Sequence, residues 1–286
     1  MAASASSEVK RERISRFSLL HTSAVVVFVA AAAATLYFAR SMSDSMPMPG
    51  GWNMSMAWTP MGSWLSTALM FSLMWVAMMV FMMLPSTWPV LMLVRRLQHF
   101  QAARHPDLLT WTVASGYFLA WTVFGIGALI AGIAIGRAAM SSEPFSRAVP
   151  LLTGAVVVVA GIYQWMPVKS ACLRHCRDPL LLVAHAHRGW RGALRLGLHH
   201  GSYCVGCCWA LMASLFALGV MSITWMVVVA GLIAIEKTAP SRAVATYGVA
   251  AALLGLGVLL LAAPEAVPLL TIPGTHSPMQ HMQMSP

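Results

Sequence analysis

The chain has 286 residues, of which 59% are hydrophobic and only 9% are charged, and its formal net charge is +10. A soluble domain carries about 25% charged residues to cover its surface, so this composition excludes an ordinary cytosolic globular protein. It also excludes a disordered chain, because disordered segments are poor in the apolar residues that dominate here. The composition instead predicts a polytopic membrane protein, since each membrane-spanning helix takes roughly 20 apolar residues.

The predicted fold is therefore all-α, a polytopic transmembrane helix bundle. Uncharged runs separated by charged gaps predict seven helices, at 18–39, 64–94, 110–136, 149–167, 200–218, 221–235 and 243–263. The uncharged run 196–235 would be about 60 Å long as one helix, twice the thickness of a bilayer core. We therefore divide it near Gly219, and an undivided helix, which gives six spans, is the alternative.

The positive charges predict the orientation of this bundle, because Lys and Arg are more frequent in cytoplasmic loops. With the N-terminus inside, seven helices place 15 of these residues inside and 3 outside, whereas six helices give 13 and 5. We expect a multi-pass protein of the bacterial inner (plasma) membrane. Its partner is the lipid bilayer and not nucleic acid, because the charges lie between the apolar runs. The predicted parts are a cytoplasmic tail at 1–17, the bundle at 18–263 with an outer Met-rich loop at 40–63, and a Met/His-containing tail at 264–286.

Cysteine usage indicates metal or redox chemistry. All five cysteines lie within 37 residues, at the predicted cytoplasmic ends of two helices: Cys172, Cys176, Cys204, Cys207 and Cys208. A reducing compartment argues against structural disulfides. Helical spacings of three and four place thiols on one face, where converging thiolates bind Cu(I) or Zn(II). The alternative is that these cysteines are small apolar residues of helix packing.

Charged and imidazole side chains surround the cysteines in the sequence. Cationic neighbours are expected to lower the thiol pKa toward the thiolate that metals need, and they are Lys169, Arg174 and Arg177. Three histidines are candidate additional ligands: His175, His199 and His200. Glu236 and Lys237 end a predicted helix, where they are either functional groups or a boundary of the membrane segment.

The chain also has 22 methionines, whose thioethers select Cu(I) or Ag(I) over harder ions. One predicted helix carries four of them at intervals of four, which form a ladder along one side: Met70, Met74, Met78 and Met82. Core packing is the alternative for this ladder. Methionines in the outer loop and the tail have no evident core to fill, so we expect them to collect metal.

Two motifs carry a family resemblance. Lys169-x-x-Cys172-x-x-x-Cys176-Arg177 and Cys204-x-x-Cys207-Cys208-Trp209 resemble the paired motifs of a bacterial family described as predicted metal-binding integral membrane proteins. The resemblance covers roughly residues 64–263 and implies metal binding without an established reaction. Besides the lysine, arginine and cysteines of these motifs, it marks Trp209 and Glu236 as supporting positions. The chain departs from the family pattern at Ser222, where Asn is usual.

These observations lead to one principal hypothesis, the handling of Cu(I) through Met and Cys ligands in transport, transfer or delivery, together with a metal donor or acceptor protein. A membrane thiol–disulfide oxidoreductase or electron relay is an alternative, because Cys204-Val-Gly-Cys207 has the spacing of exchange motifs. A metallochaperone-like assembly factor and a zinc-stabilised scaffold are further alternatives. The sequence assigns no catalytic residue, so a non-enzymatic role is favoured.

Overall fold

The computed structural model describes residues 2–41, 45–48, 52–55, 63–178, 189–219, 222–239 and 241–262. This described part consists of eight helices and one two-stranded hairpin. The elements before the centre of the chain are α1 (Ala2–Ser41), β1 (Ser45–Met48), β2 (Trp52–Ser55), α2 (Trp64–Phe100), α3 (Pro106–Ser141) and α4 (Glu143–Tyr163). The elements after it are α5 (Pro167–Arg177), α7 (Gly189–Leu218), α8 (Ile223–Thr238) and α9 (Arg242–Ala262).

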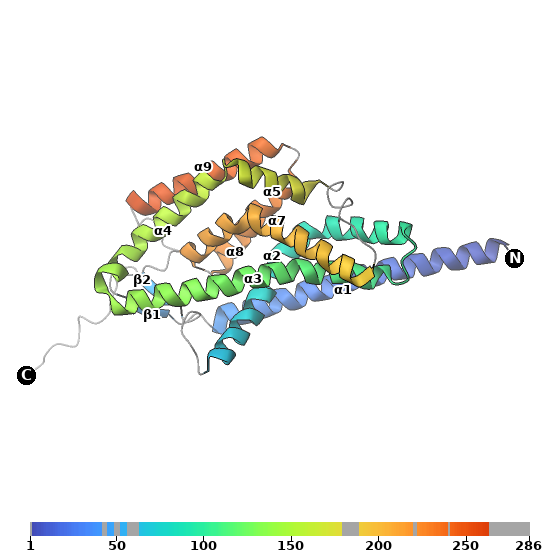
Figure 1. Cartoon of the computed structure of the whole chain (residues 1–286), viewed down its shortest axis with the longest axis horizontal. Helices are drawn as coiled ribbons and strands as arrows, with labels where there is room; N and C mark the ends of the chain where they lie inside the picture. The colour runs from blue at the N-terminus through green and yellow to red at the C-terminus, as the bar shows by residue number, and fades with distance from the viewer. Residues whose placement is uncertain are drawn as a thin grey trace, which may run out of the picture.

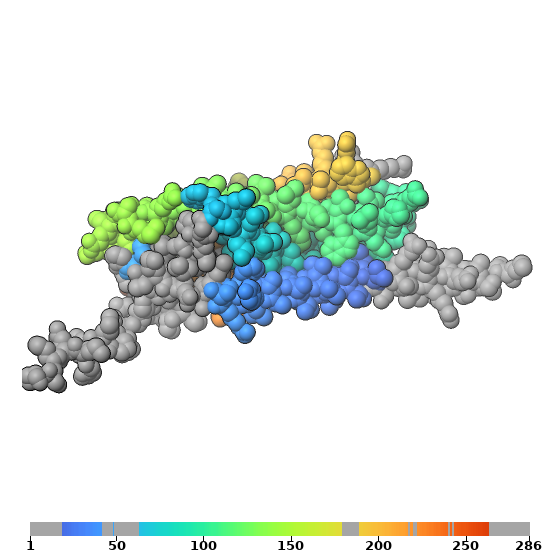
Figure 2. Space-filling model, turned by 90° about the horizontal axis from the view of Figure 1, so that it is seen from below, coloured from blue at the N-terminus to red at the C-terminus, as the bar shows by residue number. Residues whose placement is uncertain are grey.

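The helices pack side by side as a bundle around α7 (Figure 1). One side of α7 packs against α3, which in turn packs against α2, and the short helix α5 packs against α7 and also contacts α8. The pair α4 and α9 runs alongside at one end of the bundle. Figure 2 shows α1 lying along one face of the molecule, where it contacts α2. The predicted all-α bundle is therefore confirmed.

Five helices are long and apolar enough to cross a membrane: Leu19–Ser41 of α1, α2, α3, α4 and Ala243–Ala262 of α9. Helix α8 has 16 residues, slightly fewer than the 17 or so that a typical crossing takes. Helix α7 is 30 residues long and carries Arg191 and Arg195 in its first turns. These helices are compatible with a multi-pass membrane protein. The total of seven membrane spans stays a prediction.

Several helix boundaries differ from the sequence-based prediction, and two of these differences affect the segments that carry the cysteines. The helix expected at 149–167 ends at Tyr163, and Pro167 then begins the separate helix α5. Proline favours this position because its missing N–H is not needed in the first turn of a helix. Helix α7 begins at Gly189, well before the expected residue 200. The predicted division near Gly219 is confirmed: this residue has φ +111°, and the Ser222 side chain accepts a hydrogen bond at the start of α8.

The Met-rich segment at 40–63, for which an outer loop is predicted, contains the hairpin of β1 and β2. In its antiparallel register Met46 lies opposite Met54. Met48 is buried against Ala139 at the end of α3 and Phe145 at the start of α4. The expectation that methionines of this segment have no core to fill is therefore wrong for Met48. The other loop methionines and the tail at 264–286 lie outside the residues whose side chains are described.

Glycines allow α3 and α7 to approach closely, which places the middle of α7 inside the bundle. A Cβ atom on Gly197 would lie 2.0 Å from the Val113 carbonyl oxygen, and one on Gly116 would lie 2.4 Å from the Leu194 carbonyl oxygen. These neighbours are backbone atoms, so only a shift of one helix could accommodate a side chain at either glycine.

We expect Gly197→Ala to lower the free energy of unfolding by about 1–3 kcal/mol, the usual cost of overpacking. The matched control is Gly248→Ala in α9, where a Cβ atom would meet nothing within 4 Å. There the higher helix propensity of Ala should leave stability unchanged or slightly increased. Thermal unfolding of both variants in detergent checks this prediction, and equal stability of the two would contradict it.

Candidate metal centre

Helices α5 and α7 approach each other at a glycine. A Cβ atom on Gly206 would lie 2.8 Å from the Cys172 sulfur, so a larger residue at this position would displace the Cys172 side chain. The Tyr163 hydroxyl at the end of α4 donates to the Gly206 carbonyl oxygen over 2.7 Å. The Trp209 ring contacts the Tyr163 ring edge-on at 5.0 Å between centroids. Trp209 therefore supports the approach of α4 to α7.

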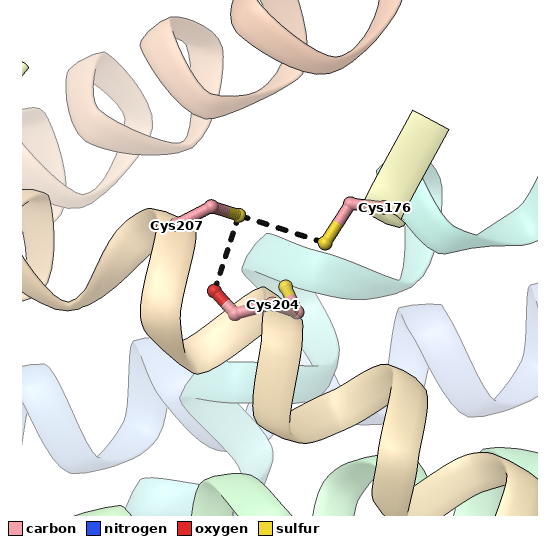
Figure 3. Close-up of side chains that lie close together, drawn as sticks. All are labelled: Cys176, Cys204 and Cys207. Carbon is pink, nitrogen blue, oxygen red and sulfur yellow. Dashed lines mark hydrogen bonds between the residues drawn. The ribbon is translucent and has the colours of Figure 1, made fainter. Parts of the chain in front are cut away.

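This approach brings three thiols together, which we call the thiol cluster: Cys176 of α5 with Cys204 and Cys207 of α7. Their sulfur atoms all lie within 4.8 Å of one another, and those of Cys176 and Cys207 are 3.7 Å apart. Figure 3 shows Cys176 facing Cys204 and Cys207 from the opposite helix. The exposed fractions of the three residues are 8%, 0% and 1%. The cysteines of the two predicted helices thus meet in one buried site.

The remaining cysteines take different places. The Cys208 sulfur lies 3.3 Å from that of Cys207, at the edge of the thiol cluster. Cys172 packs on Gly206 and does not join the cluster. All five are free thiols.

The cations near α5 do not act on the thiols as the sequence predicts. Burial raises the pKa of the Cys172 thiol. The pKa of Cys176 is raised well above its usual value, chiefly by its hydrogen bond to the Cys204 sulfur. Both thiols are therefore protonated at neutral pH without metal, and metal binding to Cys176 would release its proton. The expectation of a lowered pKa is wrong for these two thiols, because burial and the hydrogen bond to the Cys204 sulfur raise it. Lys169 and Arg177 are engaged elsewhere.

Those two cations fix α5 on α8. The Lys169 ammonium donates to both carboxylate oxygens of Glu236, at 2.6 and 2.7 Å, and each side chain is only 1% exposed. Arg177 donates to the Glu236 carbonyl oxygen over 2.9 Å and also to the Ala239 carbonyl oxygen. The interpretation of Glu236 as a simple boundary marker is therefore wrong, because it forms a buried ion pair beside the thiol cluster.

The sequence-based reasoning missed two polar contacts at the thiol cluster. The Tyr117 hydroxyl of α3 lies 2.9 Å from the Cys204 sulfur. Lys237 of α8 donates to the same sulfur over 3.1 Å and to the Ser86 hydroxyl of α2 over 3.2 Å. In the sequence, the signals for these contacts were a tyrosine within an uncharged run and a lysine next to Glu236. In the structure, Tyr117 and Lys237 place a hydroxyl and a positive charge beside the Cys204 sulfur, which would carry negative charge as a thiolate.

The histidines lie around the thiol cluster and not in it. His175 stacks on Tyr203 at 4.0 Å between ring centroids, and His199 meets the same ring edge-on at 4.9 Å. His200 is buried, and its ring centroid lies 5.7 Å from that of Tyr117. None belongs to the described group whose sulfur atoms converge.

The methionine ladder of α2 is partly buried beside the cysteines. Met74, Met78 and Met82 are buried in the same apolar core as Cys176, Cys204, Cys207 and Cys208. Met70 is 53% exposed and faces away from that core. Three of the four thioethers therefore lie in the apolar core that also holds the thiol cluster, whereas Met70 does not.

The distances of the thiol cluster suit a soft metal ion. Three sulfur atoms bound trigonally at about 2.3 Å from one ion lie about 4 Å apart, close to the separations seen here. The fold and the site together define an apolar helix bundle with a buried thiol centre of the kind that binds Cu(I).

A comparison with protein families agrees with this class. Residues 72–260 match the model of the PpoB2 family, which is described as copper chaperone. This match covers about two thirds of the 286 residues, and the chain belongs to this family. No curated protein matches the chain, and no solved structure matches it either.

Proposed function

We propose that this copper chaperone is an integral membrane protein that holds one Cu(I) ion between α5 and α7 and passes it to or from a partner protein. The single observation that carries the proposal is the convergence of Cys176, Cys204 and Cys207 within 4.8 Å in a buried site. Thiolates are the ligands that Cu(I) prefers, and a buried site protects the ion from water.

Copper is favoured over zinc by the composition of the site. Zinc in structural sites takes four tetrahedral ligands, whereas three thiols make up the described cluster. The apolar core that holds the thiol cluster also contains the thioethers of Met74, Met78 and Met82, and thioethers bind soft monovalent ions without losing a proton. This environment supports Cu(I) as the cargo.

The membrane arrangement is part of the proposal. The β1–β2 hairpin packs at the turn from α3 to α4, so both connections lie at the same end of the bundle, as the seven-span topology and its six-span alternative both require. With the N-terminus in the cytoplasm this end faces outward. Methionines of the outer segment would then collect Cu(I), and the stronger thiolates deeper in the bundle would receive it. The chain carries no nucleotide-binding motif, so transfer would be passive, driven by the partner or coupled to an ion gradient.

Metal analysis of the full-length protein in detergent tests the proposal. After growth with both metals and purification under reducing conditions, we expect one copper per chain and no zinc by mass spectrometry. Zinc bound regardless of the copper supply would contradict the proposal in favour of a zinc-stabilised scaffold. A metal-free chain whose thiols cycle between reduced and disulfide forms would contradict it in favour of the oxidoreductase.

A further inference from the structure

A cavity of about 200 Å³ lies beside the thiol cluster. Helix α2 contributes Pro89, Val90 and Leu93 to its wall, α5 contributes His175 and Cys176, and α7 contributes His200. Pro89 is exposed, so the cavity reaches the surface of the described bundle. Among the described residues, Cys176 is the one member of the thiol cluster that lines it.

The buried position of the thiol cluster makes such an opening necessary. Cys204 and Cys207 are almost completely enclosed, so an ion can reach them only past another residue. Cys176 belongs to both places, because the residue lines the cavity and its sulfur lies 3.7 Å from the Cys207 sulfur. An ion bound to this sulfur from the cavity side needs only to exchange its other ligands to enter the cluster.

The two imidazoles have the properties of temporary ligands. Imidazole nitrogen binds copper but is less soft than thiolate, so an ion held there passes readily to the cysteines. The ring of His175 is held flat against Tyr203, with 9° between their planes. The ring of His200 is buried next to Tyr117, whose hydroxyl contacts Cys204. Both rings are therefore fixed at the wall of the cavity without being members of the cluster.

We infer that this cavity is an exchange port through which Cu(I) moves between a partner and the thiol cluster, with His175 and His200 as transient ligands. The inference rests on the proposed function. Copper stays Cu(I) throughout: the two imidazole nitrogens release it as the sulfur atoms bind it, and each thiol that binds gives its proton to solvent.

Transfer kinetics test the exchange port separately from metal binding. Cu(I) is supplied to the full-length protein in detergent as its bicinchoninate complex, and the loss of that complex's colour is followed by stopped flow. We expect His175→Ala/His200→Ala to slow transfer about tenfold, which corresponds to about 1.4 kcal/mol on the barrier, while the copper bound at equilibrium stays the same. The matched control is His105→Ala, an exposed histidine before α3 whose side chain makes no cap hydrogen bond.

A second variant closes the cavity without removing a ligand. Val90→Phe fills the wall of α2 and should also slow transfer, whereas Leu73→Phe, at an exposed position of the same helix outside the lining, should not. Transfer at the wild-type rate in both Val90→Phe and the double histidine variant would overturn the inference and leave the proposed function standing. A double histidine variant that binds less copper at an unchanged rate would overturn it too. A wild-type chain that takes no copper would overturn the proposed function itself.

Discussion

Replacing Cys207 with Ser is expected to abolish high-affinity copper binding. Cys207 lies at the centre of the thiol cluster, 3.7 Å from the Cys176 sulfur and 3.3 Å from the Cys208 sulfur. Loss of a residue that merely orients a metal ligand weakens binding by about 10–100-fold, so loss of a ligand should weaken it by at least roughly 100-fold. Competition with a chromogenic Cu(I) chelator measures this change in affinity.

The matched control for this experiment is Cys172→Ser. Cys172 lies one turn before Cys176 on α5 and packs on Gly206, outside the thiol cluster. Its replacement makes the same sulfur-to-oxygen change where the same two helices meet. Copper affinity should therefore stay within a few-fold of the wild-type value. Equal loss of copper in both variants would show that the cysteines act through packing and not as ligands of one ion.

Replacing Lys169 with Met is expected to lower the free energy of unfolding by about 3–5 kcal/mol, because it leaves the Glu236 carboxylate buried without a partner. The double variant Lys169→Met/Glu236→Leu removes both charges and should recover most of this loss. Thermal unfolding in detergent measures both. Copper affinity should fall with the single variant as well, since Lys169 fixes the helix that carries Cys176.

An exposed ion pair provides the comparison for this prediction. Arg147 and Glu143 are paired one turn apart on α4, with exposed side chains. Exposed pairs contribute about 1 kcal/mol or less, so Arg147→Met should change stability little. If Lys169→Met and Arg147→Met had the same small effect, the ion pair of Lys169 and Glu236 would not be what holds α5 on α8.

Most helices of this protein can be predicted from the sequence, because each long uncharged run has enough apolar residues for one helix. Gly219 marks the break between α7 and α8 through a backbone conformation that glycine adopts easily. The convergence of cysteines could also be predicted, since helical spacing places thiols on one face. The break before Pro167 was less evident, because the apolar run continues across it.

The polar surroundings of the thiol cluster could not be predicted in the same way. Tyr117 is 87 residues from Cys204 in the chain, and Lys237 is 33 residues from it. Their contacts depend on how α3, α7 and α8 pack, which periodicity within one helix does not determine. The burial of Lys169 and Glu236 also depends on how helices pack. In the sequence each residue stands at the end of an apolar run, and the packing of α5 on α8 encloses both side chains.

X-ray absorption spectroscopy of the copper-loaded protein tests the central claim most directly, because it identifies the atoms bound to the ion. We predict Cu(I) with a ligand shell of sulfur alone, and fewer sulfur ligands in the Cys176→Ser variant but not in Cys172→Ser. A shell dominated by nitrogen or oxygen, or one that Cys176→Ser leaves unchanged, would contradict the assignment of the copper to the thiols between α5 and α7.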